Sequence, residues 1–108
     1  MKGLVIDNLG GNCPVQGEGT VLGVPFYFRA RHEEWSMGIG EDPVAVTRAE
    51  IGAIWYKSEA WGDGEFAAGW MEREVARGII ESCAALYMIE RETATREAEQ
   101  DGQRHQNL

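Results

Sequence analysis

The sequence predicts an α+β protein with an antiparallel sheet of three to four strands, arranged as a meander, and one long C-terminal helix packed on one face. Within residues 15–40, consecutive runs alternate apolar and polar side chains and are joined by short turns. From about residue 70 the apolar residues change to the 3.6-residue period of an amphipathic helix. The fourteen glycines favour a turn-rich fold over a helical bundle. A length of 108 residues indicates one domain.

Three strands are predicted in series, at 15–21, 26–31 and 35–40. Gly23 lies in the first turn, where a positive φ is needed. Short turns between successive strands predict antiparallel pairing. One face should be core and carries Phe26, Phe28, Trp35, Met37 and Ile39. The opposite face should be solvated or contacted by another element, and carries Tyr27, Arg29, Arg31 and Ser36.

The flanking segments are less regular. Residues 1–14 are rich in turn formers and predict a loop after one short strand. Thr47 and Glu50 have capping-box spacing, which predicts a short helical turn near 47–50. A β-branched and aromatic run then predicts a fourth strand across about 52–58.

The predicted helix covers about 20 residues, and its apolar stripe is expected to lie on the sheet. That stripe comprises Met71, Val75, Ile79, Leu86 and Ile89, with Cys83 beside it. Gly78 costs a helix roughly 1 kcal/mol relative to alanine, so we expect a strand or an aromatic ring close to it. Beyond about Thr93 no large apolar residue occurs before the last position. We therefore expect a single domain over 1–93 and a frayed or disordered polar tail over 94–108.

The formal net charge of −8 limits the classes of partner. Residues 41–108 carry 14 acidic and seven basic residues, so most of the negative charge lies in the second half. Such a chain is not expected to bind nucleic acid directly or an anionic membrane, because both need cationic side chains. No apolar segment approaches the length of a membrane span. The two cysteines, Cys13 and Cys83, could form one disulfide, but two reduced thiols in a cytosolic protein are the expectation.

The sequence carries no recognised motif for a cofactor or a metal site. The glycines at 17, 19 and 23 lack nucleotide-binding spacing, and the cysteines and histidines lack zinc-ligand spacing. We expect no cofactor and no metal site. His32 lies in a turn beside Glu33 and Glu34, where a solvated histidine is the common case. A Cys13–His32 or Ser36–His32 pair has no supporting motif, so we expect a non-enzyme, with a small enzyme using His32 as the least favoured alternative.

The segment 59–74 is the predicted partner-binding surface, because it places aromatic side chains among carboxylates. In the alternative interpretation, the aromatics fold back and cap the core. A smaller cationic strip, Arg29, Arg31 and His32, is expected to pair with neighbouring acids. The predicted partner-binding residues are Glu59, Trp61, Asp63, Glu65, Phe66, Trp70, Glu72 and Glu74.

Three sequence strings, "NCPVQGEG", "PFYFRAR" and "GWM", carry a resemblance over roughly residues 11–89. The chain resembles small uncharacterised proteins encoded by phages and prophages of proteobacteria. The resemblance implies a bacterial or viral cytosolic setting and attaches no chemistry to any residue. Small acidic phage proteins often act by binding, and some inhibit host defences by occupying a site built for a phosphate backbone.

These observations lead to one expectation and one main alternative. The expectation is a non-enzymatic acidic binding protein of phage origin that occupies a basic site on a protein partner. A host nucleic-acid-handling complex, such as a CRISPR effector, is the kind of partner expected for an anti-CRISPR-like inhibitor. The alternative is a self-associating structural or accessory protein, a homodimer through the solvated sheet face or an open edge strand.

Overall fold

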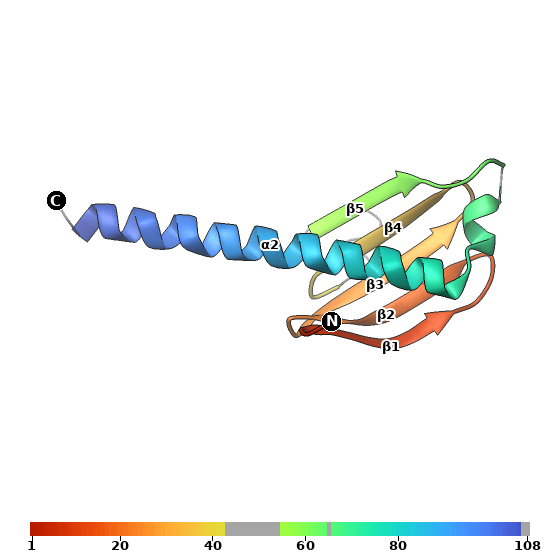
Figure 1. Cartoon of the computed structure of the whole chain (residues 1–108), viewed down its shortest axis with the longest axis horizontal. Helices are drawn as coiled ribbons and strands as arrows, with labels where there is room; N and C mark the ends of the chain where they lie inside the picture. The colour runs from red at the N-terminus through yellow and green to blue at the C-terminus, as the bar shows by residue number, and fades with distance from the viewer. Residues whose placement is uncertain (43–54, 65, 107–108) are drawn as a thin grey trace.

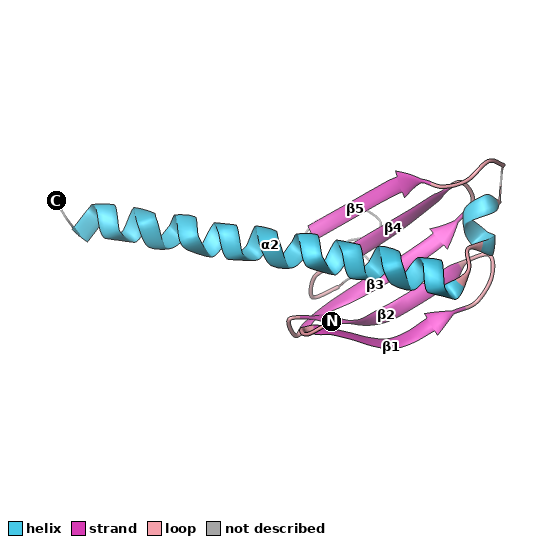
Figure 2. Cartoon of the chain, viewed as in Figure 1, coloured by secondary structure: helices cyan, strands magenta, loops and turns pink. Residues whose placement is uncertain are grey.

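Five strands, each paired with its neighbour in sequence, form one antiparallel sheet in the computed structural model, which describes residues 1–42, 55–64 and 66–106. The strands are β1 (Leu4–Gly10), β2 (Val15–Val21), β3 (Val24–Arg31), β4 (Glu34–Ile39) and β5 (Trp55–Ala60). A 3-10 helix, η1 (Ala67–Trp70), and a long helix, α2 (Arg73–Gln106), follow. Helix α2 lies across one face of the sheet (Figures 1 and 2). The predicted α+β meander is confirmed, with five strands instead of three to four.

The residues in the turns between strands have the positive φ angles that tight hairpins need. Leu22 and Gly23 both have positive φ, 51° and 80°, so two residues close the β2–β3 hairpin. The next hairpin turns at His32, with φ of 57°. In the resulting register Phe28 lies between Gly17 of β2 and Met37 of β4. The alternating apolar residues of three strands therefore share one face.

The N-terminal arm forms a complete strand, β1, which pairs with β2 along the length of both. The register shifts between Ile6 and Asn8, which is a β-bulge. A Cβ atom at Gly19 would lie only 1.9 Å from the carbonyl oxygen of Val5. Gly19 is therefore required for β1 to pass this close to β2.

Strand β5 lies near the predicted fourth strand but extends two residues further, to Ala60. Its register with β4 places Trp55, Lys57 and Glu59 on the face that α2 covers. The helical turn expected near 47–50 lies outside the described residues, as does the start of the strand expected at 52–58.

The core lies between the sheet and α2. The five apolar residues predicted for the sheet's contribution, Phe26, Phe28, Trp35, Met37 and Ile39, are all buried. The helix contributes Ala76, Ile80, Cys83, Ala84 and Tyr87. The prediction of the core face of the sheet is therefore confirmed.

The predicted core stripe of the helix was wrong in part. Met71 and Cys83 are buried and Ile79 packs against the core, but Val75 is 37% exposed, Leu86 39% and Ile89 59%. Two of the buried helix positions, Ala76 and Ala84, are alanines, which lets the helix backbone approach the strands there. The close approach is at Gly17, where a Cβ atom would lie 3.1 Å from Cδ1 of Ile80. At Gly78, where a close contact was expected, a Cβ atom would meet nothing within 4 Å.

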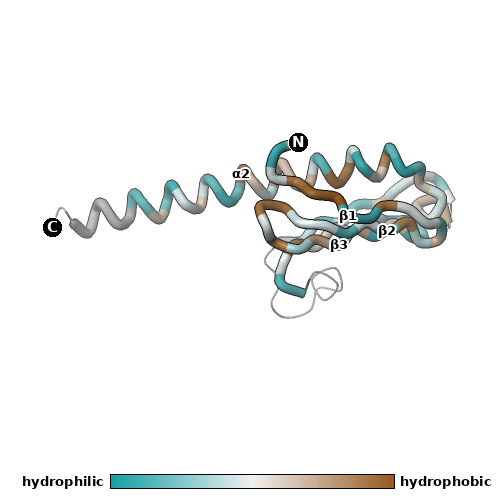
Figure 3. Tube along the Cα trace, turned by 90° about the horizontal axis from the view of Figure 1, so that it is seen from below, coloured by the Kyte–Doolittle hydropathy of each residue, from teal (hydrophilic) through white to brown (hydrophobic). Residues whose placement is uncertain are grey.

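The helix also continues past Thr93 to Gln106. Residues 89–100 are all exposed, and this part of α2 projects beyond the sheet (Figures 1 and 3). It gives the molecule extents of 58 × 26 × 23 Å. The domain boundary at residue 93 stays a prediction, but the helix runs through it.

The sheet face away from α2 is not uniformly solvated. Tyr27 is 7% exposed and Ser36 is 6% exposed, whereas Arg31 is exposed. This face was expected to be either solvated or contacted by another element. Tyr27 and Ser36 are buried, so they are not solvated.

Candidate binding surfaces

The end of the molecule that carries η1 is held together by backbone hydrogen bonds from the segment 61–69. The N–H of Trp61 donates to the carbonyl oxygen of Glu33 at 2.7 Å, and the N–H of Ala68 donates to that of His32 at 3.0 Å. The N–H of Cys13 donates to the carbonyl oxygen of Gly69 at 2.7 Å. The segment after β5 is thereby anchored to the β3–β4 turn and to the β1–β2 loop.

Two aromatic side chains at this end point outward. Phe66 is 52% exposed and Trp70 is 66% exposed. Tryptophan and phenylalanine are enriched at protein interfaces, so these two exposed rings mark a candidate contact surface. The carboxylates of Asp63, Glu72 and Glu74 are exposed close to them in sequence. We refer to these five residues as the aromatic end.

The rest of the predicted set lies elsewhere. Trp61 is half-buried and packs against the core, as the alternative interpretation expected for all the loop aromatics. Glu59 lies on the helix-covered face of β5, where its Oε1 is 3.4 Å from Nζ of Lys57. Glu65 lies outside the described residues. The predicted residues therefore do not form one continuous surface.

Trp61 and Glu59 belong to a groove of about 300 Å³ between α2 and β5. We call it the α2–β5 groove. The helix supplies one wall, β5 supplies the other through Lys57 and Glu59, and Trp35 and Trp61 complete the lining. Its size is at the lower limit of typical ligand pockets, and most of its lining is apolar. The lining residues from α2 are Val75, Gly78, Ile79, Ser82, Cys83 and Leu86.

Sequence reasoning missed this groove although its signal is present. Val75, Ile79, Ser82, Leu86 and Ile89 follow spacings of four and three residues, the pattern of one helix face. That face was assigned to the core. In the structure it lies beside the core and forms the wall of the groove.

Cys83 lies at the back of the groove, and its side chain is buried. Burial raises the pKa of its thiol from 9.0 to about 12, because desolvation disfavours the thiolate. Lys57 opposes this shift and Glu59 adds to it. Cys83 is therefore a protonated, apolar part of the groove near neutral pH, and not a nucleophile.

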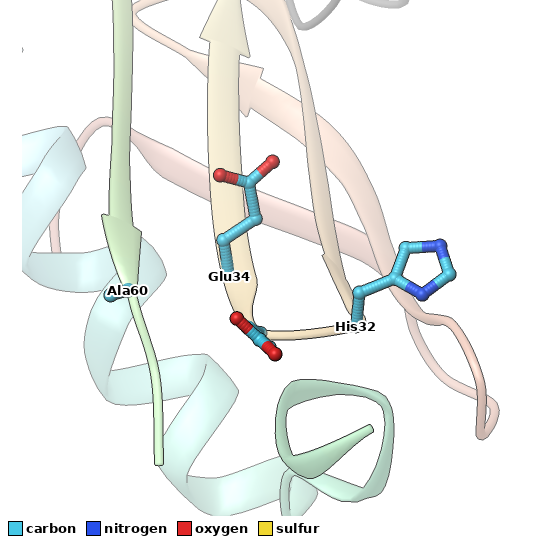
Figure 4. Close-up of a pocket in the computed structure, with 4 residues that line it drawn as sticks. His32, Glu34 and Ala60 are labelled. Carbon is cyan, nitrogen blue, oxygen red and sulfur yellow. The ribbon is translucent and has the colours of Figure 1, made fainter. Parts of the chain in front are cut away.

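His32 borders two depressions. His32, Glu33, Glu34 and Ala60 line an open depression of about 470 Å³, but the imidazole points away from Glu34 and Ala60 (Figure 4). On its other side His32 shares a depression of about 290 Å³ with Cys13. There the ring centroid of His32 lies 6.1 Å from that of Phe66.

The two nucleophiles considered for His32 are placed differently. Cys13 is an exposed free thiol beside it, and Ser36 is buried in β4 opposite Ser58. In the cationic strip, Arg31 lies directly opposite Glu34 in the β3–β4 register, as expected for cross-strand pairing.

Comparison with known proteins adds no family. No family model matches the chain, and no match is found among curated proteins or solved structures. Within the described residues, no group of three or more histidine, cysteine, aspartate or glutamate side chains could hold a metal ion. In the same residues, neither helix combines the length and hydropathy needed to cross a membrane.

Proposed function

We propose that this chain is a non-enzymatic binding protein whose acidic surface occupies a basic site on a protein partner. The observation that carries the proposal is Trp70, which is 66% exposed at the end of η1. Tryptophan is enriched among the residues that dominate binding energy at protein interfaces. An exposed tryptophan on a firmly anchored segment loses little conformational freedom on binding.

The charge around Trp70 favours a basic partner. Asp63, Glu72 and Glu74 are exposed around it in sequence. Glu74 has Arg77 as its ion-pair partner, but at 3.9 Å between exposed groups this interaction is weak. Carboxylates that are not neutralised on their own surface can interact with lysine and arginine on another.

A site that normally binds a phosphate backbone is the best electrostatic match, since it concentrates lysine and arginine. This chemistry agrees with the phage-type sequence strings and with an inhibitor of a host nucleic-acid-handling complex such as a CRISPR effector. The net charge of −8 would speed association at low salt and make it strongly dependent on ionic strength.

The test is a pull-down from a bacterial lysate with the tagged full-length chain at low and high salt, followed by mass spectrometry. The purified partner is then titrated with labelled nucleic acid, and the chain is added as a competitor. We expect displacement of the nucleic acid that weakens with salt. Trp70→Ala should reduce the competition about tenfold or more.

A combined variant, Asp63→Asn, Glu72→Gln and Glu74→Gln, should have a similar effect. The matched control is Glu92→Gln with Glu97→Gln and Glu99→Gln, which removes three exposed charges from the projecting part of α2. The proposal is wrong if Trp70→Ala and the combined variant compete as well as the wild type. It is also wrong if the control variant weakens competition as much as the combined variant does.

A second candidate function, self-association, has its own supporting observation. Strand β1 is an edge of the sheet, and Met1, Val5 and Leu22 expose apolar side chains beside it. The N–H of Leu22 donates to the carbonyl oxygen of Gly3 at 2.7 Å, which joins these residues into one region. Light scattering decides this candidate, since a monomer at high concentration removes it.

A further inference from the structure

The α2–β5 groove is separate from the aromatic end and leads to a second inference. Its helix wall continues past the groove as an apolar track, Val75, Ile79, Leu86 and Ile89, with Ser82 in the middle. This track is about 21 Å long at 1.5 Å per residue. Its exposed members were predicted to be core, and the sheet does not cover them. A track of this length suits a second helix better than a compact small molecule.

Gly78 gives an independent reason to expect a partner packed closely against α2 at the groove. It lies in the wall of the groove, is exposed, and has nothing within 4 Å of where its Cβ atom would be. Glycine in the middle of a helix costs roughly 1 kcal/mol relative to alanine. Within the described residues, no neighbouring atom explains why this position is a glycine. A partner helix packed on α2 would explain it, because the absence of a side chain lets two helix axes approach more closely.

The charged side chains beside the track indicate which kind of partner helix fits it. Within the groove, Lys57 is already paired with Glu59. Glu90 lies four residues after Leu86, so its carboxylate is on the track's side of α2.

The nearby arginines of the helix point elsewhere. Arg73 and Arg91 each lie nine residues from Ser82, about 180° around the helix. A partner with basic residues beside its apolar face therefore fits. A second copy of α2 would place acid against acid.

We propose that the α2–β5 groove binds an amphipathic helix of a partner protein, with an apolar face flanked by lysine or arginine. The apolar face packs against Val75, Ile79 and Leu86, and the partner's backbone passes over Gly78. The cations of the partner interact with Glu90. This site does not depend on the proposed function of the aromatic end, and either can fail alone.

The experiment uses the isotope-labelled full-length chain and a synthetic helix of roughly 14 residues, matched to the length of the track. The probe has leucine at three- and four-residue spacing and lysine at the other positions. The control peptide replaces lysine with glutamate. The four tryptophan indole N–H signals report the location of binding. We expect the Trp61 signal to shift saturably with the leucine–lysine peptide, while that of Trp70 is unchanged.

The variant Gly78→Leu fills the groove and should weaken this binding about tenfold. Ala94→Leu, on the exposed and projecting part of α2, is its matched control and should bind as the wild type does. If Gly78→Leu does not fold, Ser82→Arg replaces it, because it places a cation in the groove wall. It should weaken binding of the cationic peptide similarly.

Three results would overturn the proposal. One is the absence of a saturable Trp61 shift, and another is equal binding of the leucine–glutamate peptide. The third is equal binding by the wild type and the groove variants. If light scattering finds a dimer that Gly78→Leu dissociates, the groove is instead the contact between two copies.

Discussion

Trp55 and Glu90 join the edge of the sheet to the helix at the point where the helix leaves it. The indole N–H of Trp55 donates to Oε2 of Glu90 at 2.5 Å, and the Trp55 ring meets the Tyr87 ring edge-on with centroids 6.5 Å apart. The hydrogen bond has a charged acceptor, so it is stronger than one between neutral groups.

Glu90→Gln should therefore lower the free energy of unfolding by about 1 kcal/mol, because a neutral acceptor replaces the carboxylate. Urea denaturation measures this difference. Glu92→Gln is the matched control, since it affects only the exposed pair of Glu92 with Arg96 and should change stability by less than about 0.5 kcal/mol. Equal effects of the two variants would show that the Trp55 bond contributes nothing.

Gly78→Ala should raise the free energy of unfolding by about 0.5–1 kcal/mol, because the new methyl group meets no atom and the helix gains propensity. Thermal denaturation with circular dichroism detects the change. Gly69→Ala should have the opposite sign, since its Cβ would lie 2.9 Å from Sγ and 3.1 Å from Cα of Cys13. A destabilised Gly78→Ala variant would mean that the groove is narrower than described.

The two thiols should differ in reactivity. Cys13 is exposed and should react with Ellman's reagent in the folded protein at pH 8, whereas Cys83 should react only after unfolding. Cys13→Ser should remove the fast phase and leave the slow one. A fast phase that persists in this variant would place Cys83 in solvent.

The raised pKa of Cys83 also affects stability at high pH. The folded state holds the thiol proton up to about pH 12 and the unfolded state releases it above about 9, so stability falls as pH rises through this range. The wild type should lose up to about 1.4 kcal/mol per pH unit more than Cys83→Ala does. Parallel stability profiles for the two proteins from pH 9 to 11 would contradict this assignment.

Removal of the residues after Thr93 should leave the stability of the remaining domain within about 0.5 kcal/mol of the wild type, because residues 94–100 are exposed. Far-ultraviolet circular dichroism should show the loss of helix, and urea denaturation should show an almost unchanged midpoint. A large drop in stability would mean that the projecting helix contacts the domain.

The sequence predicted the sheet better than the helix. The two-residue period of β2, β3 and β4 assigned Phe26, Phe28 and Met37 to the core face, because strand side chains alternate strictly. Two adjacent faces of the helix carry apolar side chains, and the more hydrophobic face was assigned to the core. Ala76 and Ala84 carry less hydropathy than Val75 and Leu86, yet their small size is what allows close packing against the strands.

The candidate surface was predictable only in part. Trp61 and Trp70 occur in one predicted loop with similar neighbours. Trp61 lies two residues after Glu59, so it continues the alternation of β5 on the helix-covered face and packs against the core. Its N–H donates to the carbonyl oxygen of Glu33, which extends the pairing of β4 with β5. The sequence prediction ended the strand at residue 58, so the opposite placements of the two side chains were missed.

The meander topology has a consequence for how the chain folds. The β1–β2, β2–β3 and β3–β4 hairpins each close over a few residues, so most of the sheet can assemble from local contacts at low entropic cost. Docking of α2 against β1 joins segments about 70 residues apart and closes the longest loop. We therefore expect the first four strands to form in the folding transition state and α2 to dock late. The α2–β5 groove would then be among the last parts of the molecule to acquire its shape.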